Sequence, residues 1–200
     1  MRALAWTQYD THSIRFFETY ESLEFRYMHK VFFRFLPKDG GRCLDVGAGS
    51  GRDAAAMARR GYKVTAVEPS IGLRTLAEQH HGGLSIKWLD DSLPELRTVK
   101  ALRTRYAFIL LSAIWMHISP DDRPESLKTL AELLEPEGYL AMTLRLGTPD
   151  PERTMFPVSS SELVRQAAAS GLKPCYVGRP SRDSLHRGGV RWVKVVLSRA

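Results

Sequence analysis

Cysteine is scarce in this sequence of 200 residues. The two cysteines, Cys43 and Cys175, lie far apart, and two thiols alone cannot complete a zinc site. We interpret both as small apolar core residues. His80 and His81 precede two glycines and have no cysteine or carboxylate beside them in the sequence, so we interpret them as a helix end. No metal site is therefore expected.

Long apolar runs are also missing. No stretch approaches the roughly 20 apolar residues that a membrane-spanning helix needs. The N-terminal residues run quickly into Thr7, Gln8, Tyr9 and Asp10, which leaves no room for the apolar block of a signal peptide. We therefore expect a cytoplasmic protein without a membrane partner.

Acidic residues are few in the last part of the chain. The formal net charge is +7, and residues 145–200 contain ten lysines and arginines against four acids. A basic face of this kind steers anionic partners, including nucleic acid. A solvated surface rich in arginine explains the same composition, so nucleic acid is kept as an alternative partner that is not favoured.

From residue 42 onward, short strands and helices are expected to alternate. Before that point, residues 10–36 are rich in aromatic side chains and predict one or two amphipathic helices. Strands are expected at residues 42–46, 63–67, 84–88, 106–112, 139–145, 173–177 and 190–197. Helices are expected at residues 53–60, 71–79, 120–134 and 159–170. Alternation with such short connections predicts an α/β fold with a mostly parallel sheet and right-handed crossovers.

A glycine-rich segment follows the first expected strand. It has the pattern Gly47-x-Gly49-x-Gly51, and Asp45 stands two residues before the first glycine. Glycines at such a turn let the backbone come close to a ligand. A dinucleotide fingerprint has the spacing Gly-x-Gly-x-x-Gly and binds a pyrophosphate, which a carboxylate would repel. The spacing and Asp45 therefore favour a ligand with an ammonium group over NAD.

Two further acidic positions follow the next two expected strands. Glu68 ends the second strand, about twenty residues after the loop, where a carboxylate can accept hydrogen bonds from both ribose hydroxyls. Asp90 and Asp91 follow the third strand, where either can accept the amino group of adenine. A helix N-cap formed by Asp90, Asp91 and Ser92 is the alternative. Because the three elements end consecutive strands, we expect them to form one ligand site.

These segments together resemble the motifs of class I S-adenosylmethionine-dependent methyltransferases. Residues 44–51 resemble the first motif, 66–70 the acidic second motif, 90–94 the adenine-side motif and 134–139 the turn before the fifth strand. Residues 20–23, 26–27, 88–91, 111–117 and 189–192 resemble a bacterial subgroup of small stand-alone methyltransferase domains. Ala107 departs from the family, whose fourth strand often begins with an acid.

The resemblance implies a Rossmann-like sheet of seven strands, with the last strand antiparallel and helices on both faces. It implies S-adenosylmethionine as cofactor and S-adenosylhomocysteine as product. We expect a single domain over residues 1–200, with a helical lid at 1–37 and the core at 42–200. The expected cofactor-binding residues are Asp45, Gly47, Ala48, Gly49, Glu68, Pro69, Asp90, Asp91, Ser92, Ser112 and Tyr20.

Candidates for the acceptor side come from the lid and from the later strands. His117 follows the fourth strand and is a candidate general base, with a structural histidine that orders the next helix as the alternative. Tyr9 and Trp115 are expected to line the acceptor pocket, although core packing explains Trp115 equally well. Arg145 and Arg191 are expected to hold an acidic acceptor by bidentate contacts, with structural ion pairs as the alternative.

The sequence contains no asparagine, so the Asn-Pro-Pro-Tyr type motif of amino-group methylation on adenine or glutamine is missing. The compact chain and its aromatic lid favour a methyltransferase that acts on a small molecule. Methylation of nucleic acid or protein is one alternative. A non-catalytic binder of S-adenosylmethionine or S-adenosylhomocysteine is the other.

Overall fold

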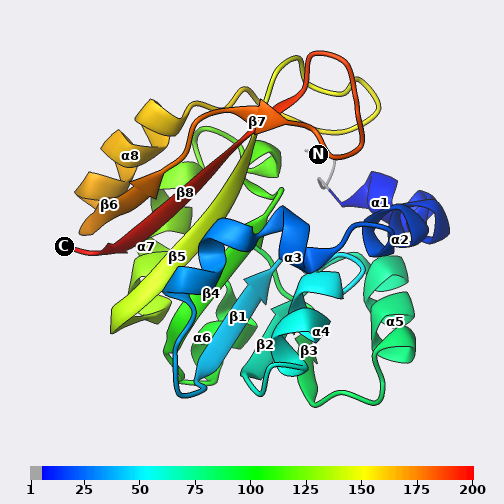
Figure 1. Cartoon of the computed structure of the whole chain (residues 1–200), viewed down its shortest axis with the longest axis horizontal. Helices are drawn as coiled ribbons and strands as arrows, with labels where there is room; N and C mark the ends of the chain where they lie inside the picture. The colour runs from blue at the N-terminus through cyan, green and yellow to red at the C-terminus, as the bar shows by residue number, and fades with distance from the viewer. Residues whose placement is uncertain (1–5) are drawn as a thin grey trace.

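A mostly parallel sheet runs through the middle of the molecule, whose computed structural model describes residues 6–200. Within that range the strand order is β3-β2-β1-β4-β5-β8-β6, with β7 paired to β8 as an eighth strand (Figure 1). The strands are β1 (Arg42–Val46), β2 (Lys63–Val67), β3 (Ile86–Leu89), β4 (Tyr106–Ser112), β5 (Leu134–Leu146), β6 (Leu172–Val177), β7 (Ser181–Arg182) and β8 (Arg191–Arg199). Neighbours among β1–β5 are parallel, whereas β8 is antiparallel to β5, β6 and β7. The predicted Rossmann-like α/β fold is confirmed.

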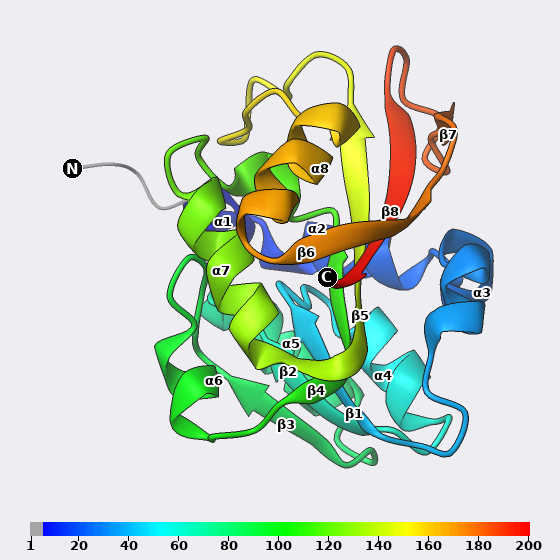
Figure 2. The same cartoon turned by 90° about the vertical axis from the view of Figure 1, so that its left-hand side faces the viewer.

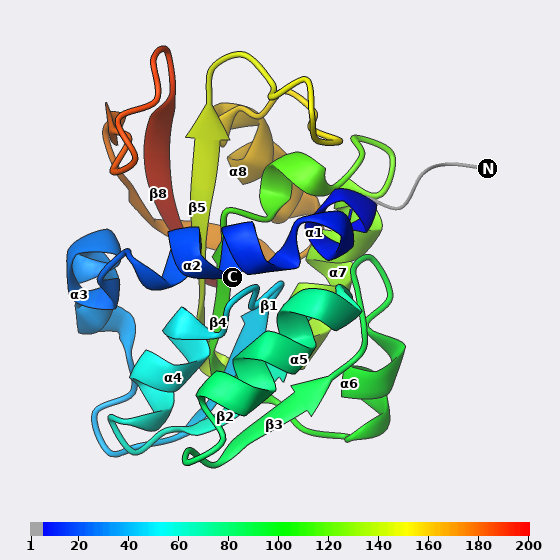
Figure 3. The same cartoon turned by 90° about the vertical axis from the view of Figure 1, so that its right-hand side faces the viewer.

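Helices cover both faces of the sheet. One face carries α3 (Phe25–Met28), η1 (Lys30–Phe35), α4 (Arg52–Ala58) and α5 (Ile71–His80) (Figure 3). The other carries α6 (Arg97–Ala101), α7 (Arg123–Leu133) and α8 (Ser160–Ala169) (Figure 2). The short helices α1 (Thr7–Thr11) and α2 (Ser13–Glu21) contact α5, and η2 (Trp115–His117) follows β4. In the described part of the chain, none of the helices has the length and apolarity needed to cross a membrane.

The coverage of both faces explains why the central strands are apolar along their whole length. In β4, Phe108, Ile109, Leu110 and Leu111 are all buried, although their side chains alternate between the two faces. A strand enclosed in this way lacks the polar alternation of a half-exposed strand. Phe108 belongs to the core under α3 and α4, and Ile109 to the core under α6, α7 and α8.

The short elements are where the structure differs from the sequence prediction. β1, β2 and β4 have the predicted bounds, but α6, η2 and β7 have only two to five residues and were not predicted. Elements this short show too few residues for a periodicity to appear. β5 begins at Leu134 rather than at residue 139, because the segment before Gly138 continues in an extended conformation.

Candidate functional site

A cavity of about 410 Å³ lies at the carboxyl ends of β1, β2 and β4. Helices α1 and α2 pass over these strand ends (Figure 3). The volume falls within the ~300–1,000 Å³ that is usual for small-molecule sites. The predicted site residues that line the cavity are Tyr9, Tyr20, Asp45, Gly47, Ala48, Gly49, Glu68, Pro69, Asp91, Ser92, Ser112, His117 and Arg145. The structure does not place Asp90, Trp115 or Arg191 on its wall.

The glycine-rich loop is hydrogen-bonded to the end of β2 and packs against Ile114, which follows β4. The backbone N–H groups of Gly47 and Ala48 both donate to the carbonyl of Val67, each at 2.8 Å. Gly47 has a φ of +70°, and a Cβ placed there would lie 2.2 Å from Cδ1 of Ile114. The positive φ favours glycine, and any larger residue would also force the Ile114 side chain to move.

Asp45 ends in the cavity as a buried carboxylate without a partner. The residue is 1% exposed, and neither carboxylate oxygen has a hydrogen-bond partner among residues 6–200. Burial raises the pKa of Asp45 well above its usual range, and the charge of Asp53 raises that pKa further. Since an unpaired buried charge is costly, a cation that enters the cavity beside Asp45 is stabilised there.

Glu68 joins the end of β2 to the glycine-rich loop. Its Oε2 accepts the N–H of Gly49 at 2.7 Å, and its Oε1 accepts the N–H of Ser70 at 2.9 Å. Burial raises the pKa of Glu68 to about 7, even though these two hydrogen bonds favour the charged form. The carboxylate is therefore positioned by the backbone and titrates near neutral pH.

The two aspartates after β3 have different surroundings. The carboxylate of Asp91 accepts the N–H groups of Thr98 and Val99 at 2.7 and 3.0 Å, and so caps the start of α6. The side chain of Asp90 is 68% exposed and pairs with Arg74 at 3.0 Å. The N-cap position of α6 is Leu96, so Asp91 satisfies these N–H groups from the preceding loop and not as the N-cap residue. Of the two aspartates, only Asp91 lines the cavity.

A buried network joins the N-terminal segment to the helix after the glycine-rich loop. Nε2 of His29 lies 2.8 Å from Oδ2 of Asp53, and Nε of Arg52 donates to Oδ1 of Asp53 at 2.7 Å. Arg52 also donates to the carbonyl of Tyr20 at 3.2 Å. Burial by itself would raise the pKa of Asp53, but the charges of His29 and Arg52 hold that pKa well below its usual range. This network was not predicted, because His29 and Tyr20 lie far in the sequence from Arg52 and Asp53.

The histidine pair at the end of α5 does have a carboxylate partner, so that part of the sequence interpretation was wrong. Glu21 Oε1 lies 3.5 Å from Nε2 of His81, and Oε2 lies 3.8 Å from Nε2 of His80. The fold brings Glu21 there from the end of α2. Nε2 of His81 also donates to the carbonyl of Ser50 at 3.1 Å, so its electron pair is not available to a metal ion.

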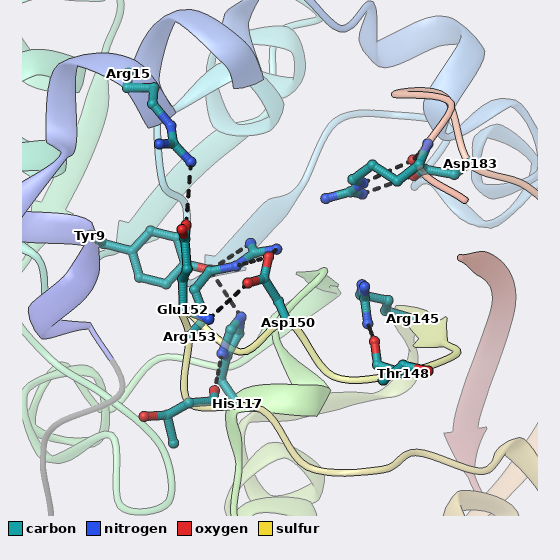
Figure 4. Close-up of polar contacts among 11 residues, drawn as sticks. Tyr9, Arg15, His117, Arg145, Thr148, Asp150, Glu152, Arg153 and Asp183 are labelled. Atoms are coloured by element: carbon teal, nitrogen blue, oxygen red, sulfur yellow. Dashed lines mark hydrogen bonds and ion pairs between the residues drawn. The ribbon is translucent and has the colours of Figure 1, made fainter. Parts of the chain in front are cut away.

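His117 lies between the lid helix α1 and the chain after β5 (Figure 4). Its Nδ1 donates to the carbonyl of Thr154 at 2.7 Å, and its Nε2 lies 3.0 Å from the hydroxyl of Tyr9. Because a carbonyl can only accept, Nδ1 carries the proton in the neutral ring, and the electron pair of Nε2 accepts the hydrogen bond from the Tyr9 hydroxyl. Burial lowers the pKa of His117 to about 4 and, despite the hydrogen bond to Thr154, keeps the ring neutral at physiological pH.

Two arginines at the same end of the cavity form ion pairs that the sequence did not predict. Arg153 donates through Nη2 to Asp150 at 2.7 Å, and Arg187 donates through Nη2 to Asp183 at 2.8 Å. Both arginines line the cavity, as does Arg145. From the sequence, residues 145–200 were recognised only as basic, and those that line the cavity could not be distinguished from those on the surface.

The position of Arg191 follows from the pairing of β5 with β8. In that register Arg145 stands opposite Trp192. Successive side chains of a strand point to opposite faces, so Trp192 lines the cavity with Arg145, while Arg191 is exposed to solvent. Trp115 is 1% exposed and lies in the core, where the guanidinium of Arg123 is 5.8 Å from its ring centroid. The core-packing alternative describes Trp115.

Comparisons by sequence relate the chain to methyltransferases. Residues 20–174 match a family model described as a methyltransferase domain. An uncharacterized methyltransferase of Staphylococcus carnosus (strain TM300) is 26% identical over 100 residues, which are 50% of this chain and 45% of that protein. One of Oceanobacillus iheyensis is 24% identical over 120 residues, 58% of this chain and 52% of that protein. The chain thus spans about half the length of the curated relatives that it matches.

Solved structures share the fold at low sequence identity. A 1,6-didemethyltoxoflavin-N1-methyltransferase of Burkholderia thailandensis has a TM-score of 0.70 at 17% identity, covering 100% of this chain and 92% of that one. The glycopeptide N-methyltransferase MtfA with S-adenosylmethionine has a TM-score of 0.67 at 16% identity, covering 87% and 93%. A TehB-like methyltransferase of Corynebacterium glutamicum has a TM-score of 0.67 at 16% identity, covering 95% and 99%. The likeness supports the fold described above.

Proposed function

This chain belongs to the family of methyltransferase domains, and we propose that it transfers a methyl group from S-adenosylmethionine to a small-molecule acceptor. The observation that carries the proposal is the buried carboxylate of Asp45, which has no partner among the described residues and lines the cavity beside the glycine-rich loop. An ammonium group supplies the missing charge, and S-adenosylmethionine carries one on its methionine end. A pyrophosphate at the same position would be repelled.

The other residues around the cavity fit the rest of this cofactor. Glu68 is placed to accept the ribose hydroxyls, since a carboxylate oxygen can accept a second hydrogen bond beside the N–H that it already holds. Asp91, Ser92 and Leu93 line the cavity, and in the proposed complex they surround the adenine. Backbone and side-chain contacts complete the set, from Gly47, Ala48, Gly49, Pro69, Ser112 and Tyr20.

The residues on the acceptor side position the acceptor and exclude water. When bound, S-adenosylmethionine supplies an electrophilic methyl group on a sulfonium, so the protein mainly has to orient the acceptor. Tyr9 and Tyr20 come from the lid helices and cover this end of the cavity. His117 is neutral, and we propose that its Nε2, which accepts a hydrogen bond from the Tyr9 hydroxyl, takes up the proton that the acceptor atom loses.

The size and walls of the cavity favour a small acceptor. A volume of about 410 Å³ must hold both cofactor and acceptor. The glycopeptide and toxoflavin-precursor enzymes that share the fold are named for acceptors other than nucleic acid. Binding of RNA or DNA with a steep salt dependence would instead favour the nucleic-acid alternative, because phosphate contacts release counterions.

Calorimetric titration with S-adenosylhomocysteine tests the proposal, with NAD as the control ligand. We expect saturable binding of S-adenosylhomocysteine at one site and no binding of NAD, because only the former brings an ammonium group to Asp45. Absence of S-adenosylhomocysteine binding would contradict the proposed function. Binding of NAD alone would identify a nicotinamide enzyme instead.

The same titration at different pH values tests the role of Glu68. Ribose hydroxyls bind the charged carboxylate better, and the pKa of Glu68 in the free protein is raised to about 7 by burial. Binding therefore releases a proton below this pH, and Asp45 adds an effect of the same sign. For Glu68 we expect the affinity to fall by up to about tenfold per pH unit as the pH drops below about 7. Equal affinities at pH 6 and pH 8 would contradict this assignment.

The variant His117→Ala tests the proposed base. We expect methyl transfer to slow by about 10²–10⁴-fold while the affinity for S-adenosylhomocysteine changes less than twofold. The rate is measured with labelled S-adenosylmethionine and an acceptor that the wild-type protein methylates in a metabolite screen. Tyr9→Phe is the control, since it removes the hydroxyl near Nε2 and keeps the imidazole. A folded His117→Ala protein with an unchanged rate would support the structural alternative.

A further inference from the structure

Three arginines, Arg145, Arg153 and Arg187, line the acceptor end of the cavity together with Asp183. Figure 4 shows Arg153 beside Asp150, which does not itself line the cavity. Two of the arginines have a carboxylate of their own. Arg153 pairs with Asp150 through Nε and Nη2, at 3.1 and 2.7 Å. Arg187 pairs with Asp183 through Nε and Nη2, at 2.9 and 2.8 Å. These two pairs balance their own charges, and Arg145 is left as the third cation.

Arg145 has no carboxylate within ion-pair distance among residues 6–200. Its Nη1 donates to the carbonyl of Thr148 at 2.8 Å, and its buried Nε has no hydrogen-bond partner in the described range. The residue is only 8% exposed, yet it lines the cavity. Burial and the charges of Arg187 and Arg153 lower the pKa of its guanidinium. A buried cation in this position is stabilised by an anion that enters the cavity.

The surroundings of Arg145 limit the kind of anion. One guanidinium without a partner balances a single negative charge, which a carboxylate carries and a phosphate dianion exceeds. A planar carboxylate also matches the bidentate geometry of a guanidinium. Trp192 stands opposite Arg145 in the strand register, and Phe156 and Leu185 also line the cavity. These walls favour an apolar or aromatic body.

Arg145 is also placed to orient such a compound toward the reacting end. Arg145, Arg153 and His117 line the same cavity, and, in addition to burial, the charges of both arginines lower the pKa of His117. Arg153 donates to the hydroxyl of Tyr9 at 3.4 Å, and that hydroxyl lies 3.0 Å from Nε2 of His117. An acceptor held at one end by Arg145 therefore presents its other end to Tyr9 and His117.

We propose that the methyl acceptor is a small aromatic carboxylate whose carboxylate group is bound by Arg145. This inference rests on the proposed function, since it assigns the acceptor of the same site. It goes beyond the motifs of the chain, because it depends on which of the clustered arginines lacks a partner in the folded protein.

The test uses matched pairs of probes that differ only in the charge of one group. Salicylate, anthranilate and 4-hydroxybenzoate are each compared with their carboxamides, by titration into the protein saturated with S-adenosylhomocysteine. We expect at least one acid to bind about 10–100-fold more tightly than its amide, the effect of one charge-assisted bidentate contact. Arg145→Gln is expected to remove this preference and to leave the affinity for S-adenosylhomocysteine unchanged. Arg145→Lys keeps the charge and is expected to keep part of the preference.

Arg191→Gln is the matched control, because it removes an arginine of the neighbouring strand that does not line the cavity. It should keep the full preference for the acid. Equal binding of acids and amides to the wild-type protein would overturn the inference, as would a preference that persists in Arg145→Gln. Failure of all three acids to bind the complex with S-adenosylhomocysteine would also overturn it. If S-adenosylhomocysteine itself does not bind, the proposed function fails first, so the two failures are distinguishable.

Discussion

Asp45→Asn is expected to weaken the binding of S-adenosylhomocysteine by about 10–100-fold, while it raises the free energy of unfolding of the ligand-free protein. The first effect is the loss of a charge-assisted contact with the ammonium group, worth about 1.5–3 kcal/mol. The second follows because the carboxylate is 1% exposed and has no partner among the described residues. Removing an uncompensated buried charge stabilises a protein by about 1 kcal/mol or more. A lower affinity together with a higher free energy of unfolding is what we expect when a buried charge binds the ligand and does not stabilise the fold.

Calorimetry and urea denaturation at pH 8 measure the two effects. Asp90→Asn is the matched control, since that carboxylate is 68% exposed and does not line the cavity. We expect Asp90→Asn to change the affinity for S-adenosylhomocysteine by less than twofold. Its free energy of unfolding should change by less than about 0.5 kcal/mol. An Asp45→Asn protein with unchanged affinity would mean that the cavity binds a different ligand.

Asp53→Ala is expected to lower the free energy of unfolding by about 3–5 kcal/mol. The substitution leaves His29, which is fully buried, and Arg52 without their shared carboxylate. Breaking a buried pair on one side costs more than removing both partners, because the remaining charge stays uncompensated. Urea denaturation measures the loss, with the midpoint and slope taken together.

The double variant His29→Leu/Asp53→Ala provides the control for this prediction. It removes the orphaned histidine as well, and we expect it to recover part of the lost stability. A loss below about 1 kcal/mol in Asp53→Ala would contradict the view that this pair holds the N-terminal segment to α4.

Asp45 and Asp53 have different roles, although they lie close enough that the negative charge of one disfavours ionisation of the other. The charge of Asp53 is one reason why the pKa of Asp45 is raised. Asp53 is hydrogen-bonded to His29 and Arg52, whereas neither oxygen of Asp45 has a hydrogen-bond partner among the described residues. The charge of Arg52 lowers the pKa of Asp45 but does not offset the effect of burial. The protein thus satisfies the structural carboxylate internally and leaves the other for a ligand.

The sequence was sufficient to predict the features that depend on neighbouring residues. The bounds of β1, β2 and β4 were predicted, because buried parallel strands are continuous apolar runs with polar or glycine-rich ends. The glycine-rich loop was recognisable for the same reason, since its spacing and Asp45 lie within one short segment. Most of the predicted cofactor-binding residues line one cavity because parallel strands end at the same edge of the sheet.

The acceptor end shows what the sequence left open. Ten basic residues lie between residues 145 and 200, and nothing local separates those in the cavity from those on the surface. Pairing of β5 with β8 places Trp192 beside Arg145 and directs Arg191 to the other face. A shift of one residue in that register would have exchanged them.

The sequence by itself therefore determined the α/β class, the order of the main elements and the position of the cofactor motif, because these depend on local periodicity and on short connections. Only the tertiary structure decided that Glu21 meets His81 and that His29 meets Asp53. It also decided that, among the arginines that line the cavity, Arg145 is the one without an ion pair to a described carboxylate. Each of these depends on contacts between residues far apart in the sequence, set by strand register and helix packing rather than by neighbouring residues.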